Sequence, residues 1–156
     1  MEMGGVEKVI LSMLNNLNRE KFDLTLCLNM NQGELRDEIP NHVKKVYLTK
    51  GKEDFSDNTI IRNFQLIKRR LKLDKIKKNP KIADDFLNEK YDIEIAMSYG
   101  DFDSVLNSTN KNSKKIGWFH SEINIPGYET IIPNLLRQFP QFDHMVYCSH
   151  KIKDIM

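Results

Sequence analysis

The sequence has few of the residues that mark specialised classes of protein: 156 residues include two cysteines, one tryptophan and five prolines. Two cysteines exclude a disulfide-rich scaffold, and because Cys27 and Cys148 each lie in an apolar run, we expect reduced thiols in the core. No apolar run approaches the roughly 20 residues that span a bilayer. No signal peptide is recognisable. The length and composition predict a single cytoplasmic domain, residues 1–156.

Several catalytic motifs are also missing. No Gly-x-Ser-x-Gly elbow presents a nucleophile, and Gly51-Lys52-Glu53 does not complete a Walker phosphate loop. His42, His144 and His150 lack metal-ligand spacing, so we expect no metal site. Neither cysteine is expected beside a histidine in a catalytic pair, and the Cys148–His150 spacing is attributed to chance. The sequence therefore predicts neither a metal nor a covalent nucleophile.

Strand-like and helix-like segments alternate along the chain. The apolar patterns predict strands at 22–28, 43–48, 92–97, 115–119 and 143–148, and helices at 6–17, at 57–90 with a break at Pro80, at 101–106 and at 131–139. Ser149 is the expected N-cap of a last short helix. This order predicts the α/β class, with a parallel sheet covered by helices on both faces.

A glycine pair, Gly4-Gly5, precedes the first helix. That helix is expected to be amphipathic, with its buried stripe at Val6, Val9, Ile10, Met13, Leu14 and Leu17. A glycine pair at a helix start can bring backbone N–H groups close to an anion or hydroxyl. Such a loop normally follows a strand, so the first strand of the sheet is expected to be missing ahead of residue 1. The alternative is that the glycines only start the helix.

Polar residues follow the predicted third and fourth strands, where ligands bind in open parallel sheets. Tyr99 and Asp101 follow the third strand, and His120 and Glu122 follow the fourth. His120 is the candidate catalytic residue, because an imidazole there can hydrogen-bond to a sugar or phosphate or act as an acid or base. A backbone-satisfied strand-end histidine is the plainer interpretation. Asp101 either caps its helix, the simpler role, or binds a ligand hydroxyl.

The helical region also carries a basic cluster that includes Lys68, Arg69, Arg70 and Lys72. These residues occupy the circumference away from an apolar stripe formed by Ile60, Phe64, Ile67 and Leu71. A solvated helix face is the simplest interpretation, and peripheral contact with an anionic membrane is the next. Nucleic acid is not expected as a partner, because few aromatic residues interleave with the charges.

Taken in order, several segments resemble the N-terminal half of bacterial family 4 glycosyltransferases. The matching segments are Gly4–Lys8 with the helix after it, Phe22–Leu26, Gly33–Leu35, Tyr91–Ala96, Lys115–His120 and Val146–Ser149. The resemblance implies the GT-B architecture, in which two Rossmann-like domains face a cleft and a nucleotide-sugar is used without an obligatory metal or other cofactor. Gly4 and Gly5 would match the glycine loop that meets donor phosphates or acceptor, and His120 the histidine that touches the transferred sugar.

The resemblance further implies an acceptor-side, Rossmann-like domain that lacks its first strand and the nucleotide-binding second domain. Such a domain would serve sugar transfer from a nucleotide-sugar to a glycan or lipid-linked acceptor in cell-surface polysaccharide synthesis, and would not turn over substrate alone. The alternative is a non-enzymatic α/β binding or assembly module. Without its first strand the sheet would expose an edge through which the chain could self-associate.

Overall fold

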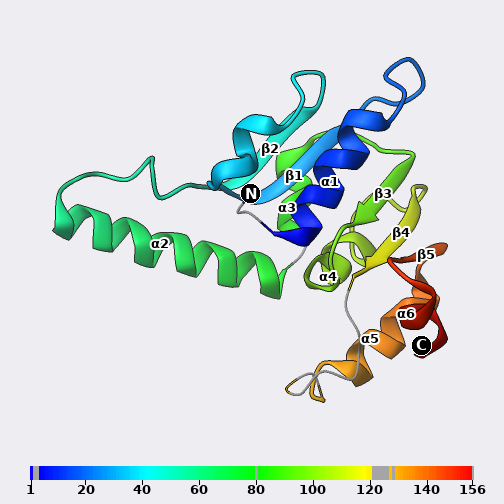
Figure 1. Cartoon of the computed structure of the whole chain (residues 1–156). Helices are drawn as coiled ribbons and strands as arrows, with labels where there is room; N and C mark the ends of the chain where they lie inside the picture. Colours follow the sequence, from blue (N-terminus) through cyan, green and yellow to red (C-terminus); the bar gives the residue numbers. More distant parts are fainter. Residues whose placement is uncertain (2–3, 80, 121–126, 128, 156) are drawn as a thin grey trace. The chain divides into compact units, whose positions relative to one another are not determined.

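A computed structural model describes every residue of the chain except 2–3, 80, 121–126, 128 and 156. The chain divides into two compact units, Met1–Leu87 and Asn88–Met156. Both units are α/β, with small parallel sheets interleaved with helices (Figure 1), which confirms the predicted alternation. None of the helices in the described part of the chain combines the length and hydrophobicity that crossing a bilayer requires.

The first unit contains a two-stranded parallel sheet. Its elements are α1 (Gly5–Asn16), β1 (Thr25–Asn31), the 3₁₀ turn η1 (Glu34–Glu38), β2 (Lys44–Lys50), α2 (Thr59–Lys78) and α3 (Ile82–Leu87). β1 begins three residues later than predicted, because its ladder with β2 starts where the Leu24 carbonyl accepts a hydrogen bond from the Lys44 N–H (2.8 Å). Phe22, the first residue of the predicted strand, is 43% exposed.

Helix α1 has the predicted amphipathic pattern. Ile10 and Leu14 are buried, Leu11 is buried beside them, and the other predicted stripe residues are half-buried. The 3.6-residue period therefore identified both the helix and its inner face.

The expectation of buried thiols is wrong for both cysteines. Side chains alternate between the two faces of a strand, and in β1 this alternation buries Leu26 and exposes Cys27. Cys148 directly follows the last strand of the chain and is exposed as well. An apolar run alone did not reveal which of its residues faces outward.

Helices α2 and α3 confirm the predicted helical region and its break near Pro80. The Asn58 side chain caps α2 by accepting hydrogen bonds from the N–H groups of Ile60 (3.0 Å) and Ile61 (3.3 Å). Near its other end, Ile76 of α2 is buried with Leu48 of β2 and Ala83 of α3. This small core attaches both helices to the first unit.

The second unit contains a three-stranded parallel sheet in the order β3-β4-β5, so β4 is central. Its elements are β3 (Ile93–Ala96), the turn η2 (Tyr99–Asp101), α4 (Phe102–Leu106), β4 (Lys114–Phe119), α5 (Ile132–Gln138), the turn η3 (Phe139–Gln141), β5 (His144–Tyr147) and α6 (His150–Ile155). Ser149 caps α6 as predicted, since its Oγ accepts from the Ile152 N–H (3.2 Å). Ala96, Phe102, Phe119 and Leu135 form the centre of the core.

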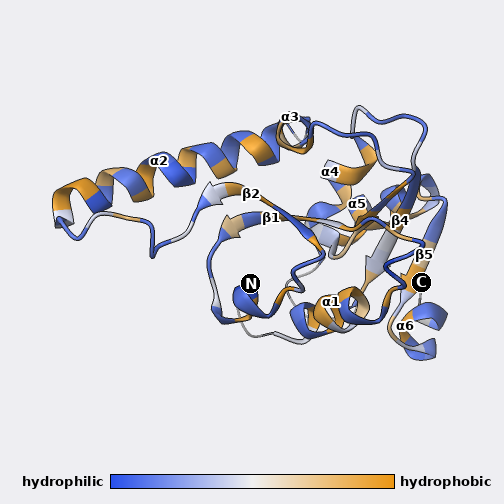
Figure 2. Cartoon of the chain, turned by 90° about the horizontal axis from the view of Figure 1, so that it is seen from above, coloured by the Kyte–Doolittle hydropathy of each residue, from blue (hydrophilic) through white to orange (hydrophobic). Residues whose placement is uncertain are grey.

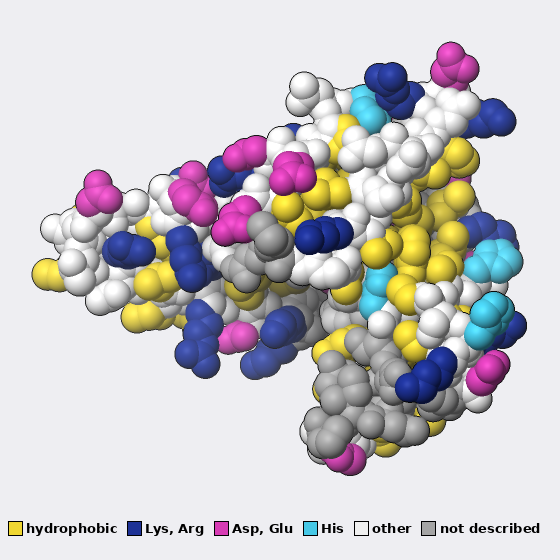
Figure 3. All heavy atoms as spheres, viewed as in Figure 1, with side chains coloured by type: hydrophobic (Ala, Val, Ile, Leu, Met, Phe, Trp, Pro, Cys, Tyr) yellow, Lys and Arg dark blue, Asp and Glu magenta, His cyan; other side chains and the backbone are white. Residues whose placement is uncertain are grey.

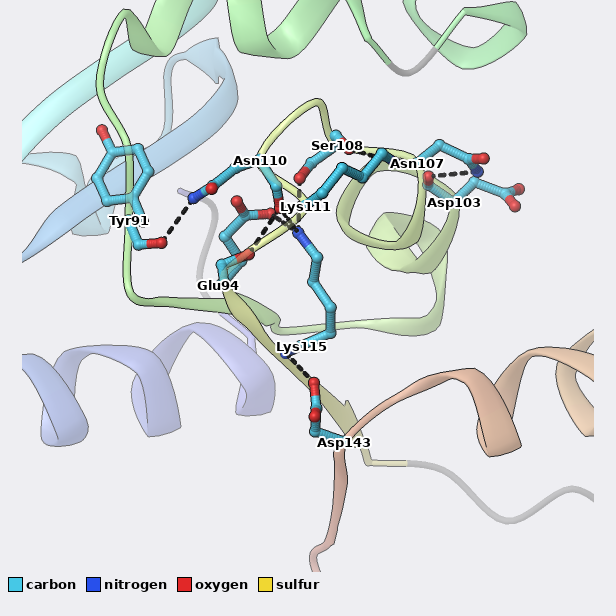
Figure 4. A network of polar contacts seen from close by, with 10 residues as sticks. Tyr91, Glu94, Asp103, Asn107, Ser108, Asn110, Lys111, Lys115 and Asp143 are labelled. Carbon is cyan, nitrogen blue, oxygen red and sulfur yellow. Dashed lines mark hydrogen bonds and ion pairs between the residues drawn. The ribbon is translucent and has the colours of Figure 1, made fainter.

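A buried ion pair lies toward the amino-terminal ends of these strands (Figure 4). Lys115 Nζ contacts Glu94 Oε2 (2.6 Å), and both side chains are at most 13% exposed. The ammonium also donates to Ser108 Oγ (2.6 Å) and to the Asn110 carbonyl (3.0 Å). The backbone N–H of Lys115 donates to Asp143 Oδ2 (2.8 Å). The ammonium thus has three hydrogen-bond acceptors, as a buried charge requires, and the network links β3, β4 and the residue before β5.

Candidate functional site

The carboxyl ends of β3, β4 and β5 bring the candidate residues of the second unit to one edge of the sheet. The register pairs Ala96 with Gly117 and Phe119 with Tyr147. The turn at Ser98–Asp101 therefore follows β3 at the level where β4 ends, and His120 and Cys148 come next to each other after β4 and β5. Parallel strands place these ends on the rim where open α/β sheets bind ligands.

The ring of His120 is held on two sides. Its Nδ1 lies 3.0 Å from Cys148 Sγ, in a contact whose donor depends on the tautomer of the ring. The indole of Trp118 is stacked on the imidazole, with ring centroids 5.5 Å apart and planes 9° from parallel. Trp118 and His120 are two residues apart, so they project from the same face at the end of β4.

This contact corrects the expectation that neither cysteine lies beside a histidine. The sequence signal that could have found it is the shared strand-end position of His120 and Cys148, 28 residues apart, rather than the close spacing of Cys148 and His150. A thiol beside an imidazole can transfer its proton to the ring, which is how cysteine nucleophiles are activated.

Asp101 does not cap α4 with its side chain, so the capping role is wrong. Its Oδ2 instead accepts a hydrogen bond from Ser98 Oγ (2.8 Å). Burial raises the pKa of the Asp101 carboxyl above its usual value of 3.8, although the hydrogen bonds from Ser98 oppose this shift. A half-buried carboxylate at a sheet rim is suited to accept a hydrogen bond from a ligand hydroxyl.

Tyr99 and Trp118 contribute aromatic surface to the same region. The Tyr99 ring packs against Phe119, with centroids 6.5 Å apart, so much of this side chain serves the core. The indole N–H of Trp118 is buried without a hydrogen-bond partner among the described residues. Glu122, the remaining candidate after β4, lies outside the described residues.

Gly4 and Gly5 belong to the first unit, at the start of α1. The backbone of Gly4 is extended (φ −145°, ψ 168°), so this turn does not require a positive φ. Gly4 also provides no side-chain cap for α1. A Cβ added to Gly5 would meet nothing within 4 Å. Gly5 is thus open to close approach, whereas the Glu7 carboxylate lies against Gly4 and would clash with a Cβ added there. This arrangement is compatible with the predicted ligand loop and also with a plain helix start.

The first unit has a polar depression that the sequence did not indicate. It has a volume of about 600 Å³ and lies beyond the carboxyl ends of β1 and β2. Arg36 lines it, with Nε 3.2 Å from Asp37 Oδ1 and Nη1 3.8 Å from Glu53 Oε2. Gly33, another lining residue, has φ 97°, which only glycine adopts readily. The other lining residues are Gln32, Glu34 and Lys52.

No cluster of three or more metal-ligating side chains occurs among the residues that the structure describes. The side chains of His120, Asp101 and Cys148 at the rim can form hydrogen bonds and exchange protons.

Comparison with known proteins finds no match to any protein-family model, to any curated protein or to any solved structure.

Proposed function

We propose that this chain is the acceptor-side part of a GT-B glycosyltransferase similar to family 4. It would serve transfer of a sugar from a nucleotide-sugar to a glycan or lipid-linked acceptor in cell-surface polysaccharide synthesis, and would bind rather than turn over its ligands when alone. The observation that carries the proposal is His120, held by Cys148 and Trp118 at the carboxyl end of the central strand of a parallel sheet.

The finer architecture belongs to the same proposal: a Rossmann-like sheet with helices on both faces. The backbone at Met1 borders the end of β1 in the first unit. The Met1 amine donates to the Gln32 carbonyl just past β1, and the Met1 carbonyl accepts from the Leu35 N–H (3.1 Å). These contacts place the backbone of Met1 beside the turn that follows β1.

The rim residues have chemistry that suits a polyhydroxylated ligand. Asp101 can accept a hydrogen bond from a hydroxyl. The His120 imidazole, whose Nδ1 contacts Cys148 and whose Nε2 is buried, has the chemistry to donate or accept one. Trp118 and Tyr99 add apolar surface against which a sugar ring can pack. In the first unit, the helix start at Gly4 and Gly5 would contribute backbone N–H donors for a phosphate or hydroxyl, with open space at Gly5 and the Glu7 carboxylate beside Gly4.

Trp118 makes the proposal testable, because it is the only tryptophan in the sequence and it is stacked on His120. Saccharides such as maltose, cellobiose and lactose are expected to change its fluorescence in a saturable way. His120→Ala and Asp101→Asn should weaken this binding about tenfold, as expected for loss of a hydrogen bond to a charged or polar group. His42→Ala, which removes an exposed histidine of the first unit, should bind like the wild type.

Saturable binding that survives both rim substitutions would contradict the proposal and favour a binding or assembly module that uses another surface. In a longer form of the protein that carries a donor-binding domain, His120→Ala is expected to lower the transfer rate by about tenfold or more. Unchanged turnover would remove His120 from the reaction.

A further inference from the structure

Helix α2 carries an apolar stripe on its exposed face. The stripe consists of residues spaced by four, three and four positions, so they lie on one side of the helix. Each is more than half exposed: Ile60 82%, Phe64 68%, Ile67 59% and Leu71 65%. Figure 2 shows hydrophobic residues recurring along α2 between hydrophilic ones.

The opposite side of α2 is attached to the first unit, which fixes the outward direction of the stripe. Leu66 and Leu73 are half-buried, and Ile76 is buried in the core with β2 and α3. Arg69 also points inward, because its Nη1 donates to Gln32 Oε1 (3.0 Å) and its guanidinium lies over the Phe55 ring. The apolar stripe is therefore a second hydrophobic face of α2, separate from the face that packs.

Cations border this stripe on both sides. At 100° per residue, Lys68 and Lys75 fall along one border and Arg70 and Lys77 along the other, and all four are exposed. Figure 3 shows basic side chains gathered beside hydrophobic ones along α2, at the left of the view. The helix has eight lysines and arginines and one aspartate. Since the whole chain carries a net charge of only +2, its other residues are net acidic.

We propose that α2 docks the protein on an anionic lipid surface, with the helix lying in the plane of the membrane. The stripe from Ile60 to Leu71 extends about 16 Å along the helix axis and enters the boundary between headgroups and acyl chains. The bordering lysines and arginines keep their apolar stems beside it while their charges meet lipid phosphates. This inference is independent of the sugar-binding proposal.

Two other occupants fit the surface less well. A second copy of the helix would bring the bordering cations of the two copies together, which opposes association. A nucleic acid would neutralise the cations but leave the stripe in water, and Phe64 is the only aromatic residue of α2 that could stack on bases.

The test uses the full chain and sedimentation with vesicles of phosphatidylcholine, with and without phosphatidylglycerol. The wild type is expected to bind the anionic vesicles and to lose affinity as salt is added. Phe64→Ser with Leu71→Ser should weaken binding about tenfold or more through lost insertion. The triple variant Lys68→Glu, Arg70→Glu and Lys75→Glu should weaken binding by a similar factor, because it removes the attraction between these cations and the anionic lipids. All substituted side chains are exposed, and circular dichroism checks that the fold is retained.

The matched control reverses three exposed cations elsewhere in the first unit: Lys8→Glu, Arg19→Glu and Lys21→Glu. It changes the net charge by the same amount as the α2 charge variant and should keep most of the binding. The proposal would be overturned if this control lost as much vesicle binding as the α2 charge variant, or if the wild type bound phosphatidylcholine vesicles equally well. It would also be overturned if Phe64→Ser with Leu71→Ser left the binding unchanged. A dimer that forms without lipid and dissociates on Phe64→Ser with Leu71→Ser would also contradict it, as would a preference of the wild type for oligonucleotides over vesicles.

Discussion

The side chains of His120 and Cys148 lie in contact, and the contact bears on the reactivity of the thiol. A nucleophilic attack by sulfur needs a base to take the thiol proton, and the imidazole Nδ1 is 3.0 Å away. Cys27 is exposed as well, on β1 of the first unit. The chain thus contains its own reference thiol.

We expect iodoacetamide to alkylate Cys148 about tenfold faster than Cys27, because the His120 ring accepts the proton as the S–C bond forms and iodide leaves. Mass spectrometry of the two peptides over a time course measures both rates in one sample. His120→Ala should bring the Cys148 rate down to that of Cys27. Equal rates in the wild type would show that the contact does not activate the thiol.

Asp101 gives a pH-dependent prediction. Burial raises the pKa of the Asp101 carboxyl in the folded state. Its contribution to folding stability is therefore present below pH 3.8, the usual pKa, and is lost as the pH rises through the pKa of the folded state. At neutral pH the ionised carboxylate therefore opposes folding. Asp101→Asn keeps an acceptor for Ser98 Oγ and removes this charge, so it should raise the Tm at pH 7 and give no gain below pH 3.8.

Differential scanning calorimetry at the two pH values measures this effect, and Asp57→Asn, at an exposed position before α2, is the control. A lower Tm for Asp101→Asn at pH 7 would mean that the carboxylate is structural. We thus expect Asp101→Asn to gain stability and to lose saccharide binding, which is the trade-off between stability and function that active sites show.

At the scale of elements, β4 depends on a glycine. A Cβ on Gly117 would come within 2.5 Å of Met145 Sδ and 3.1 Å of a Phe142 ring carbon, on neighbouring β5 and just before it. Gly117→Ala should therefore destabilise the second unit by about 1–3 kcal/mol, the usual cost of overpacking. Urea denaturation monitored by Trp118 fluorescence reports this unit. Gly5→Ala, where the added methyl group meets nothing, should not destabilise the chain.

The buried ion pair joins the same strands. Glu94→Gln leaves the Lys115 ammonium buried without its counter-charge and should cost about 3–5 kcal/mol. The double variant Glu94→Leu with Lys115→Met removes both charges and should recover much of that loss. The same urea denaturation compares the two. A single variant as stable as the wild type would show that water reaches this end of the sheet and solvates the charge.

In the molecule as a whole, local sequence patterns predict most of the helices and strands. The stripe of α1, the cap at Ser149 and the break before α3 depend on residues within a few positions of each other, and all three were predicted correctly. The His120–Cys148 contact depends on the register of β4 against β5, which no local pattern contains. This is why the site was only partly predictable.

Helix α2 shows another limit of sequence patterns. It has apolar residues on two faces, at Ile60 and Phe64 on one and at Leu73 and Ile76 on the other. Periodicity finds both sets but does not say which one packs. Only the tertiary contacts of Ile76 with β2 and α3 decide it, and they leave the more conspicuous stripe exposed.

We propose that a sugar ligand binds at the carboxyl ends of β3, β4 and β5. A titration of ¹⁵N-labelled protein with UDP-glucose and with cellobiose, followed by amide chemical shifts, tests it most directly. We expect saturable shifts at Tyr99–Asp101, at the Trp118 indole, at His120 and at Cys148, with Glu94, Ser108 and Lys115 unchanged. No shifts at millimolar ligand, or shifts confined to the ends near Glu94 and Lys115, would contradict it.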